Sequence, residues 1–180
     1  MKPMVLGFAG QIASGKSTLS KEIAKYLGWQ RVSFGDYVRT IAQYQGLDES
    51  REVLQTIGAS LMNQGKTQFC ESVLAEANWK PEHPLVIDGI RHSEIVSILR
   101  QIVSPLDFSL IFVFVNESVR CNRLVERGFS NYQHQQKIEA DSTEVQVQNI
   151  LSKIADLTLD GTHNSKDLVQ EIVIWMQKSD

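Results

Sequence analysis

The sequence predicts an α/β fold of three layers, with about five parallel strands between two layers of helices. Short apolar runs alternate along the chain with segments whose apolar residues recur at helical spacing. A glycine-rich segment, Gly10-Gln11-Ile12-Ala13-Ser14-Gly15-Lys16-Ser17, stands between the first apolar run and the first helical segment. With 180 residues, the chain has the length of one domain with a full core, and we expect residues 1–180 to form a single unit.

The apolar runs expected to be strands are short and lie between turn residues or helical patterns. They cover residues 4–9, 30–34, 85–88, 108–115 and 157–159. Helices are expected where apolar residues repeat every three to four positions, as Leu19, Ile23 and Leu27 do in the first of them. These segments cover residues 16–27, 36–45, 51–63, 68–77, 93–103, 118–127, a stretch within 136–154, and 166–177.

Two regions depart from simple alternation of strands and helices. The segment between the second and third strands, about residues 35–80, is mostly helical in pattern, and we expect it to be an insertion that binds an acceptor. The stretch 127–141 is polar and resembles a mobile flap, so a short lid is expected at about 120–143. Ligands of parallel sheets lie at the carboxyl ends of the strands, and either region is placed to close over that edge.

Composition excludes several classes of protein. The net charge is −3 without a long block of one sign, so no general nucleic-acid binding is expected. Cys70 and Cys121 are the only cysteines, and the four histidines show no metal-binding spacing. The longest apolar run, residues 108–115, is far too short to span a bilayer, and we expect no signal peptide before the first strand. We therefore expect a cytoplasmic protein without a membrane partner.

The glycine-rich segment carries the strongest chemical signal. It fills the pattern G-x-x-x-x-G-K-[ST] at every fixed position, between a strand and a helix. Its glycines let backbone N–H groups turn inward, and the helix N-terminus adds partial positive charge toward the same anion. We expect Lys16 to reach the β- and γ-phosphates of ATP and the Ser17 hydroxyl to hold Mg²⁺. The expected ATP-binding residues are Gly10, Ala13, Ser14, Gly15, Lys16, Ser17 and Thr18.

Carboxylates follow the second and third predicted strands. They occur in Ser33-Phe34-Gly35-Asp36-Tyr37-Val38-Arg39 and in Val86-Ile87-Asp88-Gly89-Ile90-Arg91. Asp88 is expected to hold Mg²⁺, directly or through water, unless Asp88-Gly89 is an ordinary turn. Asp36 is expected to orient an attacking hydroxyl or accept its proton. An N-cap of the following helix is the alternative role for Asp36, and both roles are compatible.

Arginines accompany these carboxylates. Arg39 and Arg91 are expected to bind an acceptor phosphate, although a solvated helix face is the alternative for Arg39. Arg120, Arg123 and Arg127 share one face of a predicted helix. Arg123 and Arg127 are expected to act in catalysis, whereas Arg120 is the member of the three expected to lie at the surface. Pairing with glutamates on a surface face is the alternative for all three.

Several of these segments together resemble the nucleoside monophosphate kinases, adenylate kinases especially. They are Gly10–Ser17, Gly35-Asp36-x-x-Arg39, Asp88-Gly89-x-Arg91 and the pair Arg123/Arg127. The resemblance implies a phosphate-loop (P-loop) NTPase fold. It also implies that the arginines of the second and third segments bind the acceptor phosphate and that the lid arginines clamp the transferring group.

The second half of the chain resembles dephospho-coenzyme A kinase. The residues are Arg123-x-x-x-Arg127-Gly128-Phe129-Ser130 and then Ala155-Asp156 before the last strand. This resemblance implies that Asp36 activates a hydroxyl. In phosphate-loop kinases the turn after the last strand, here within 155–162, often contacts adenine; a plain loop is the alternative.

The chain departs from both patterns. Phe34 replaces the first aspartate of the bacterial Asp-x-Asp, no proline follows Asp88-Gly89-Ile90, and residues 138–145 lack further lid arginines. Three hypotheses of function remain. The first is transfer of the γ-phosphoryl of ATP to a small nucleotide-like acceptor, the second is phosphorylation of a ribose hydroxyl as in dephospho-coenzyme A kinases, and the third is a nucleotide-binding regulatory module. A phosphate acceptor is already ionised, whereas a hydroxyl acceptor benefits from Asp36.

Overall fold

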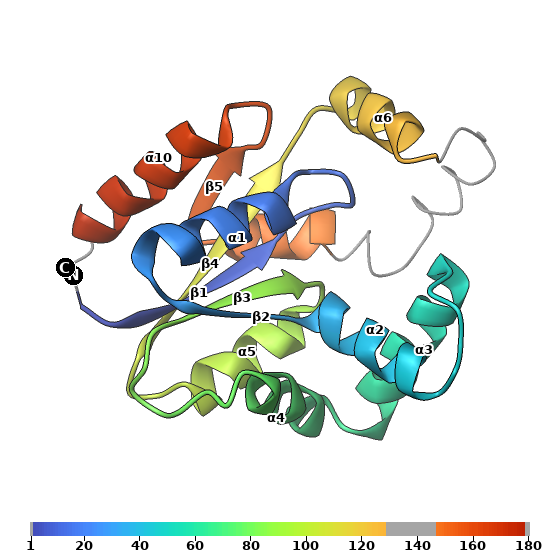
Figure 1. The fold of residues 1–180 in the computed structure, drawn as a ribbon. Coiled ribbons are helices and arrows are strands. Elements are labelled where there is room, and N and C mark those ends of the chain that lie inside the picture. The colour runs from blue at the N-terminus through green and yellow to red at the C-terminus, as the bar shows by residue number, and fades with distance from the viewer. Residues whose placement is uncertain (1, 129–146, 179–180) are drawn as a thin grey trace.

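A parallel sheet of five strands forms the centre of the molecule. The computed structural model describes residues 2–128 and 147–178 (Figure 1). The strands lie in the order β2-β3-β1-β4-β5, and each neighbouring pair is parallel. Their bounds are β1 Met4–Ala9, β2 Gln30–Ser33, β3 Leu85–Ile90, β4 Asp107–Phe114 and β5 Leu157–Asp160.

Helices cover both faces of the sheet, which confirms the predicted three layers. Helices α1 and α10 pack together on one face, and α4 and α5 lie on the other (Figure 1). The described helices are α1 Lys16–Leu27, α2 Phe34–Tyr44, α3 Arg51–Gln64, α4 Lys66–Glu76, α5 Ser93–Ile102, α6 Glu117–Glu126, a π-helix η1 Val147–Leu151, α9 Ser152–Ile154 and α10 Ser165–Lys178.

Strand β1 is buried throughout and divides the core between the two layers. Val5 and Ala9 belong to the apolar cluster on the α5 face, whereas Leu6 and Phe8 belong to the cluster with α1 and α10. This alternation follows from the two-residue period of a strand. An uninterrupted apolar run such as β1 is therefore what a strand covered on both faces requires.

Helix α2 begins two residues earlier than predicted. Strand β2 ends at Ser33, and the Ser33 hydroxyl accepts a hydrogen bond from the Asp36 backbone N–H at 3.2 Å. Ser33 is therefore the N-cap, and the alternative that Asp36 caps this helix is wrong. Phe34 lies inside the helix, because its ring packs edge to face on Phe69 of α4 at 5.0 Å between centroids.

The insertion between β2 and β3 consists of α2, α3 and α4, as its sequence pattern predicts. Most of the flap predicted at 127–141, most of the lid predicted at 120–143 and part of the helix predicted within 136–154 lie outside the described residues. Within that last stretch the structure describes η1 and α9.

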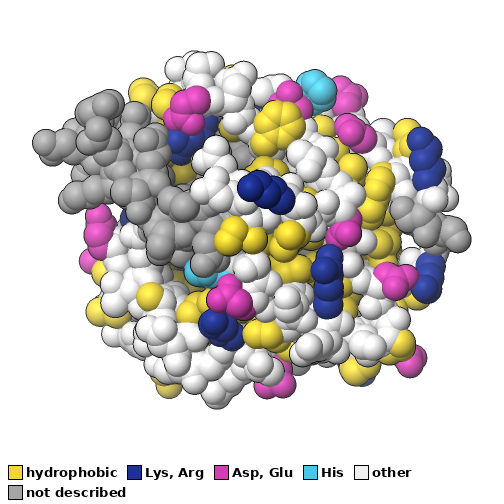
Figure 2. All heavy atoms as spheres, turned by 180° about the vertical axis from the view of Figure 1, so that it is seen from behind, with side chains coloured by type: hydrophobic (Ala, Val, Ile, Leu, Met, Phe, Trp, Pro, Cys, Tyr) yellow, Lys and Arg dark blue, Asp and Glu magenta, His cyan; other side chains and the backbone are white. Residues whose placement is uncertain are grey.

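The described surface carries mixed charge. On the face opposite that of Figure 1, basic and acidic side chains are interspersed with apolar ones (Figure 2). None of the helices in the described ranges has the length and apolar character needed to cross a bilayer.

Candidate functional site

The phosphate loop between β1 and α1 depends on two glycines. Gly10 has a φ of 151°, and a Cβ atom there would lie 2.4 Å from the Val113 carbonyl oxygen of β4. Gly15, directly before α1, has a φ of 94°. Residues that carry a Cβ atom rarely adopt either backbone conformation. The two glycines therefore let the loop lie against β4 and turn sharply into the helix.

The loop presents polar groups at the start of α1. Among the described residues, no side chain caps this helix, so its first backbone N–H groups and its positive dipole end remain for an anion. Lys16 is buried, with its Nζ 3.4 Å from the Gln11 carbonyl oxygen. The Ser14 hydroxyl is fully buried and has no hydrogen-bond partner in the described part of the chain. The predicted ATP-binding residues thus all lie in one loop and the first turn after it.

Asp88 lies at the same edge of the sheet, near the carboxyl end of β3 and directly before a β-bulge. Phe8 pairs with Asp88 and Ala9 with Ile90, which leaves Gly89 as the extra residue, with a φ of 84°. The Asp88 side chain is 2% exposed, and its Oδ2 accepts a hydrogen bond from Arg31 Nη2 at 2.6 Å. Its Oδ1 has no partner among the described residues. A buried carboxylate with one oxygen left over fits Mg²⁺ or its water shell, since Mg²⁺ binds oxygen ligands.

Asp36 lies between two arginines in the first turn of α2. Its Oδ1 accepts from Arg39 Nη1 at 2.9 Å, and its Oδ2 accepts from Arg31 Nη1 at 3.1 Å. Arg39 also places its Nε 3.7 Å from Oε2 of Glu49. Asp36 and Arg39 are about half exposed, so this cluster borders solvent. The structure thus brings Asp36, Arg39 and Asp88 together at the carboxyl ends of β2 and β3, and the roles expected of them stay predictions.

Arg31 completes this cluster and is not among the predicted site residues. Its guanidinium contacts Asp36 and Asp88, and its Nε donates to the Ser20 hydroxyl of α1 at 2.9 Å. The sequence offered one signal for Arg31: it lies in a short predicted strand that ends close to Asp36. Arg91 follows β3 directly and is partly buried, so it lies near the end of the strand that carries Asp88.

Arg123 of α6 contacts the backbone of the phosphate loop. Its Nη1 donates to the carbonyl oxygens of Ala13 and Ser14, each at 3.2 Å. Its Nη2 donates to the Gly161 carbonyl oxygen at 2.8 Å, in the turn after β5. In this structure Arg123 therefore joins two loops, which the prediction of a phosphate-clamping role did not include.

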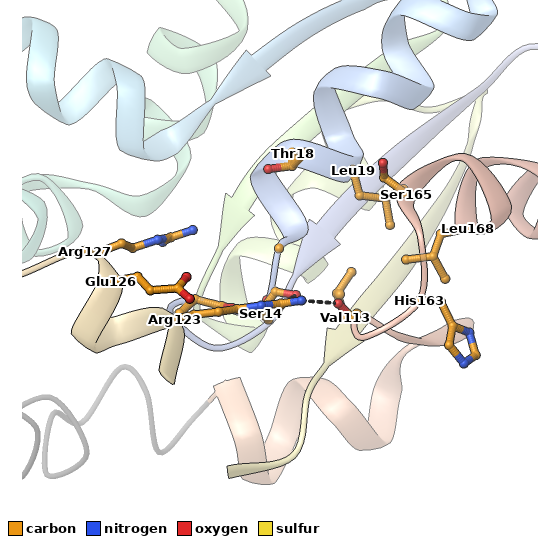
Figure 3. Close-up of a pocket in the computed structure, with 13 residues that line it drawn as sticks. Ser14, Thr18, Leu19, Val113, Arg123, Glu126, Arg127, His163, Ser165 and Leu168 are labelled. Atoms are coloured by element: carbon orange, nitrogen blue, oxygen red, sulfur yellow. Dashed lines mark hydrogen bonds between the residues drawn. The ribbon is translucent and has the colours of Figure 1, made fainter. Parts of the chain in front are cut away.

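The other two arginines of this segment, Arg120 within α6 and Arg127 directly after it, differ from each other. Arg120 is 2% exposed and makes two hydrogen bonds to Glu117, Nε to Oε2 at 3.0 Å and Nη2 to Oε1 at 2.7 Å. The expectation that Arg120 lies at the surface is wrong, because this pairing allows the guanidinium to be buried. Arg127 is exposed and lines the pocket described next (Figure 3).

A pocket of about 360 Å³ lies beside the phosphate loop, between α6 and the turn after β5 (Figure 3). The turn packs closely on the loop, because a Cβ on Gly161 would lie 2.3 Å from the Ser14 carbonyl oxygen. Asp160 Oδ1 accepts from the Thr162 backbone N–H at 2.9 Å, and this bond lowers the pKa of Asp160. The lining residues are Ala13, Ser14, Gly15, Thr18, Leu19, Val113, Arg123, Glu126, Arg127, Gly161, His163, Ser165 and Leu168.

Comparison with known families identifies the chain. The family model described as AAA domain matches residues 6–145, which is most of the sequence. The chain therefore belongs to this family. The match includes the phosphate loop, both acidic segments and α6.

Several known proteins similar to this chain are small-molecule kinases. A dephospho-CoA kinase of Fusobacterium nucleatum is 24% identical over 96% of each chain. Among solved structures, a shikimate kinase from Aquifex aeolicus covers 98% of both chains with a TM-score of 0.65 and 16% identity. An APS kinase from Mycobacterium tuberculosis, in complex with AMPPNP and APS, gives the same coverage, TM-score and identity. These likenesses confirm the predicted phosphate-loop fold and resemblance, and they support the predicted class of ATP-dependent kinase.

Proposed function

We propose that this member of the AAA domain family transfers the γ-phosphoryl group of ATP to the phosphate of a small nucleotide-like acceptor. The observation that carries this proposal is the cluster at the ends of β2 and β3. There, Asp36 is held on both carboxylate oxygens by Arg31 and Arg39, beside the buried carboxylate of Asp88. The cluster and the phosphate loop lie at one edge of the sheet, as in-line transfer between two substrates requires.

ATP, the phosphoryl donor, fits the part of this sheet edge that borders the pocket. A nucleoside in the pocket between α6 and the turn after β5 would place its phosphates over the loop. The N-terminus of α1 and Lys16 would then balance the phosphate charge, and Arg127 would approach from α6. Mg²⁺, held by Ser17 and the free oxygen of Asp88, supplies charge neutralisation on the phosphates when bound. These assignments of Ser17 and Asp88 to Mg²⁺ belong to the proposal.

A phosphate acceptor suits the contacts of Asp36 better than a hydroxyl acceptor does. A general base needs a carboxylate oxygen directed at the proton that it removes. Both oxygens of Asp36 already accept from guanidinium groups, so this carboxylate is engaged in positioning Arg31 and Arg39. In the described part of the chain, Arg39 pairs with two carboxylates at the protein surface, those of Asp36 and Glu49. An acceptor phosphate can replace them, because it offers the same charge with more acceptor oxygens.

Phosphorylation of a ribose hydroxyl is the second candidate. It is favoured by the full-length likeness to a dephospho-CoA kinase and by the position of Asp36 directly after β2. In that reaction Arg39 would turn to the acceptor and leave Asp36 Oδ1 to accept the hydroxyl proton. A nucleotide-binding regulatory module without transfer is the third candidate.

An acceptor panel separates the three candidates. The purified protein is mixed with Mg²⁺ and ATP and with each nucleoside monophosphate, with dephospho-coenzyme A, or with no acceptor. Products are separated by chromatography and identified by mass spectrometry. A nucleoside diphosphate as product supports the proposal, and a new phosphate monoester on dephospho-coenzyme A overturns it in favour of the second candidate. ATP binding without turnover on any acceptor favours the regulatory module.

A further inference from the structure

We infer that Arg31 is a positioning residue that fixes the magnesium-facing carboxylate of Asp88 and couples it to Asp36 and to α1. The inference rests on the proposed function, since it assigns Asp88 to the metal and Asp36 to the acceptor side. Three of the five N–H groups of Arg31 bind protein, so the role inferred for Arg31 is to position other residues.

The three partners of Arg31 come from three different elements. Nη2 donates to Asp88 at the end of β3, and Nη1 donates to Asp36 in α2. Nε donates to the Ser20 hydroxyl in α1. The Arg31 side chain is 15% exposed, so these contacts are largely shielded from water. One rigid, planar group therefore fixes the relative positions of the acidic residues and the helix that follows the phosphate loop.

The contact with Asp88 determines which of its oxygens can face a ligand. Arg31 occupies Oδ2, while Oδ1 is buried and without a partner among the described residues. If Arg31 were removed, the carboxylate would be a buried charge without its counter-ion, and its preferred orientation would change. Arg31 thus keeps Oδ1 available in one fixed position.

The contact with Ser20 extends this effect to the predicted metal ligand on α1. The Ser20 hydroxyl accepts from Arg31 and donates to the Ser17 carbonyl oxygen at 3.0 Å. Ser17 is the residue whose hydroxyl is proposed to hold Mg²⁺. Arg31 therefore bridges the two residues proposed for Mg²⁺, Ser17 through Ser20 and Asp88 directly. Residues that orient metal ligands typically change metal affinity or activity by about 10- to 100-fold when replaced.

Lysine cannot reproduce this arrangement. Its ammonium keeps the positive charge beside Asp88, but a single nitrogen cannot make the planar, divergent contacts of a guanidinium. Arg31→Lys therefore preserves the charge balance of the buried site while it loosens the geometry. Arg31→Gln removes the charge as well. Arg100→Gln is a matched control, because Arg100 Nη2 also pairs with an aspartate, Asp156, at 3.4 Å outside this cluster.

The test measures the Mg²⁺ requirement for binding of a fluorescent ATP analogue, which needs no acceptor. We expect Arg31→Lys to raise the half-saturating Mg²⁺ concentration about tenfold and Arg31→Gln to raise it up to about 100-fold. Binding of the analogue without Mg²⁺ should change little, because Arg31 does not contact the phosphate loop in the described structure. In transfer assays, kcat should fall while the KM for the acceptor changes much less. Arg100→Gln should match the wild type in all these measurements.

Ser20→Ala provides a second variant if the Arg31 variants do not fold. It deletes one buried hydroxyl, keeps Asp88 paired, and should raise the Mg²⁺ requirement in the same direction by a smaller factor. Folding is checked by circular dichroism. Folded Arg31 or Ser20 variants with a wild-type Mg²⁺ requirement would overturn the inference. A shifted Mg²⁺ requirement in a protein that phosphorylates no acceptor would refute the proposed function and leave the role of Arg31 intact.

Discussion

Replacement of Arg123 by alanine distinguishes two roles that this arginine could have. In the structure it donates three hydrogen bonds to carbonyl oxygens of the phosphate loop and of the turn after β5. Hydrogen bonds that involve a charged group contribute about 1.5–3 kcal/mol each. Because these carbonyl groups border a pocket, water can replace part of the loss. We therefore expect Arg123→Ala to lower the free energy of unfolding by about 2–4 kcal/mol.

The thermal consequence follows from the size of the chain. At about 2–4 °C per kcal/mol for a domain of this length, Tm should fall by roughly 4–16 °C. ATP affinity should fall too, because the loop and the turn that flank the pocket lose their connection. Arg127→Ala is the matched control, at the C-cap of the same helix. No hydrogen bond of the Arg127 side chain is found among the described residues, so this change should leave Tm unaltered and reduce only phosphoryl transfer.

Thermal unfolding followed by circular dichroism, together with equilibrium binding of an ATP analogue, measures both effects. A variant Arg123→Ala with the wild-type Tm and ATP affinity, but with kcat reduced about 100-fold, would refute this reasoning. That result would instead match a clamp on the transferring phosphoryl group, whose removal typically costs about 10²–10³ in rate.

Three further predictions concern single residues. Lys16→Ala should abolish transfer, by about 10²–10³ or more in kcat, with an unchanged circular dichroism spectrum, because it removes one charge from the phosphate site; unaltered activity would contradict the assignment of the loop. Arg39→Ala and Arg91→Ala should raise the acceptor KM or lower kcat while ATP affinity, measured by titration, stays constant; a selective loss of ATP binding would reverse their assignment. Burial raises the pKa of the Cys70 thiol to about 12, so at pH 8 a maleimide should label Cys121 alone in the native protein and both thiols in denaturant, as mass spectrometry would show.

Local patterns predicted the layers and the loop well. The fixed positions of the glycine-rich segment gave its conformation, because Gly10 and Gly15 occupy backbone geometries that other residues rarely adopt. The apolar run of β1 gave a doubly covered strand, and the structure has it over the predicted residues. These features are determined by residues that are close together in the sequence, so they can be predicted without a structure.

The start of α2 shows where local patterns were insufficient. Phe34 has the residue type of a strand, and the second strand was predicted to end there. Contact with Phe69, far along the chain, instead buries its ring from within a helix, and Ser33 supplies the cap. Tertiary packing overrides strand propensity at such a boundary.

The contacts of the arginines were the least predictable part of the site. Helical spacing placed Arg120 and Arg123 on one face, but it could not distinguish a guanidinium buried against Glu117 from one that binds distant carbonyl groups. Arg31 gave no signal beyond its position in a strand, because its partners Asp36 and Asp88 are brought to it by two different elements. Long-range hydrogen bonds of this kind are determined by the fold and not by spacing in sequence.

The two buried side-chain atoms that lack partners in the described structure, Ser14 Oγ and Asp88 Oδ1, both belong to the proposed active site. A buried polar atom without a partner costs about 1–3 kcal/mol, more for a charged group, so native proteins retain few of them. Arg31 and Arg123 hold these segments in place, since each binds groups next to an unpartnered atom. A site that is preorganised in this way need not rearrange when its ligands bind, which is the condition for electrostatic stabilisation of a transferring phosphoryl group.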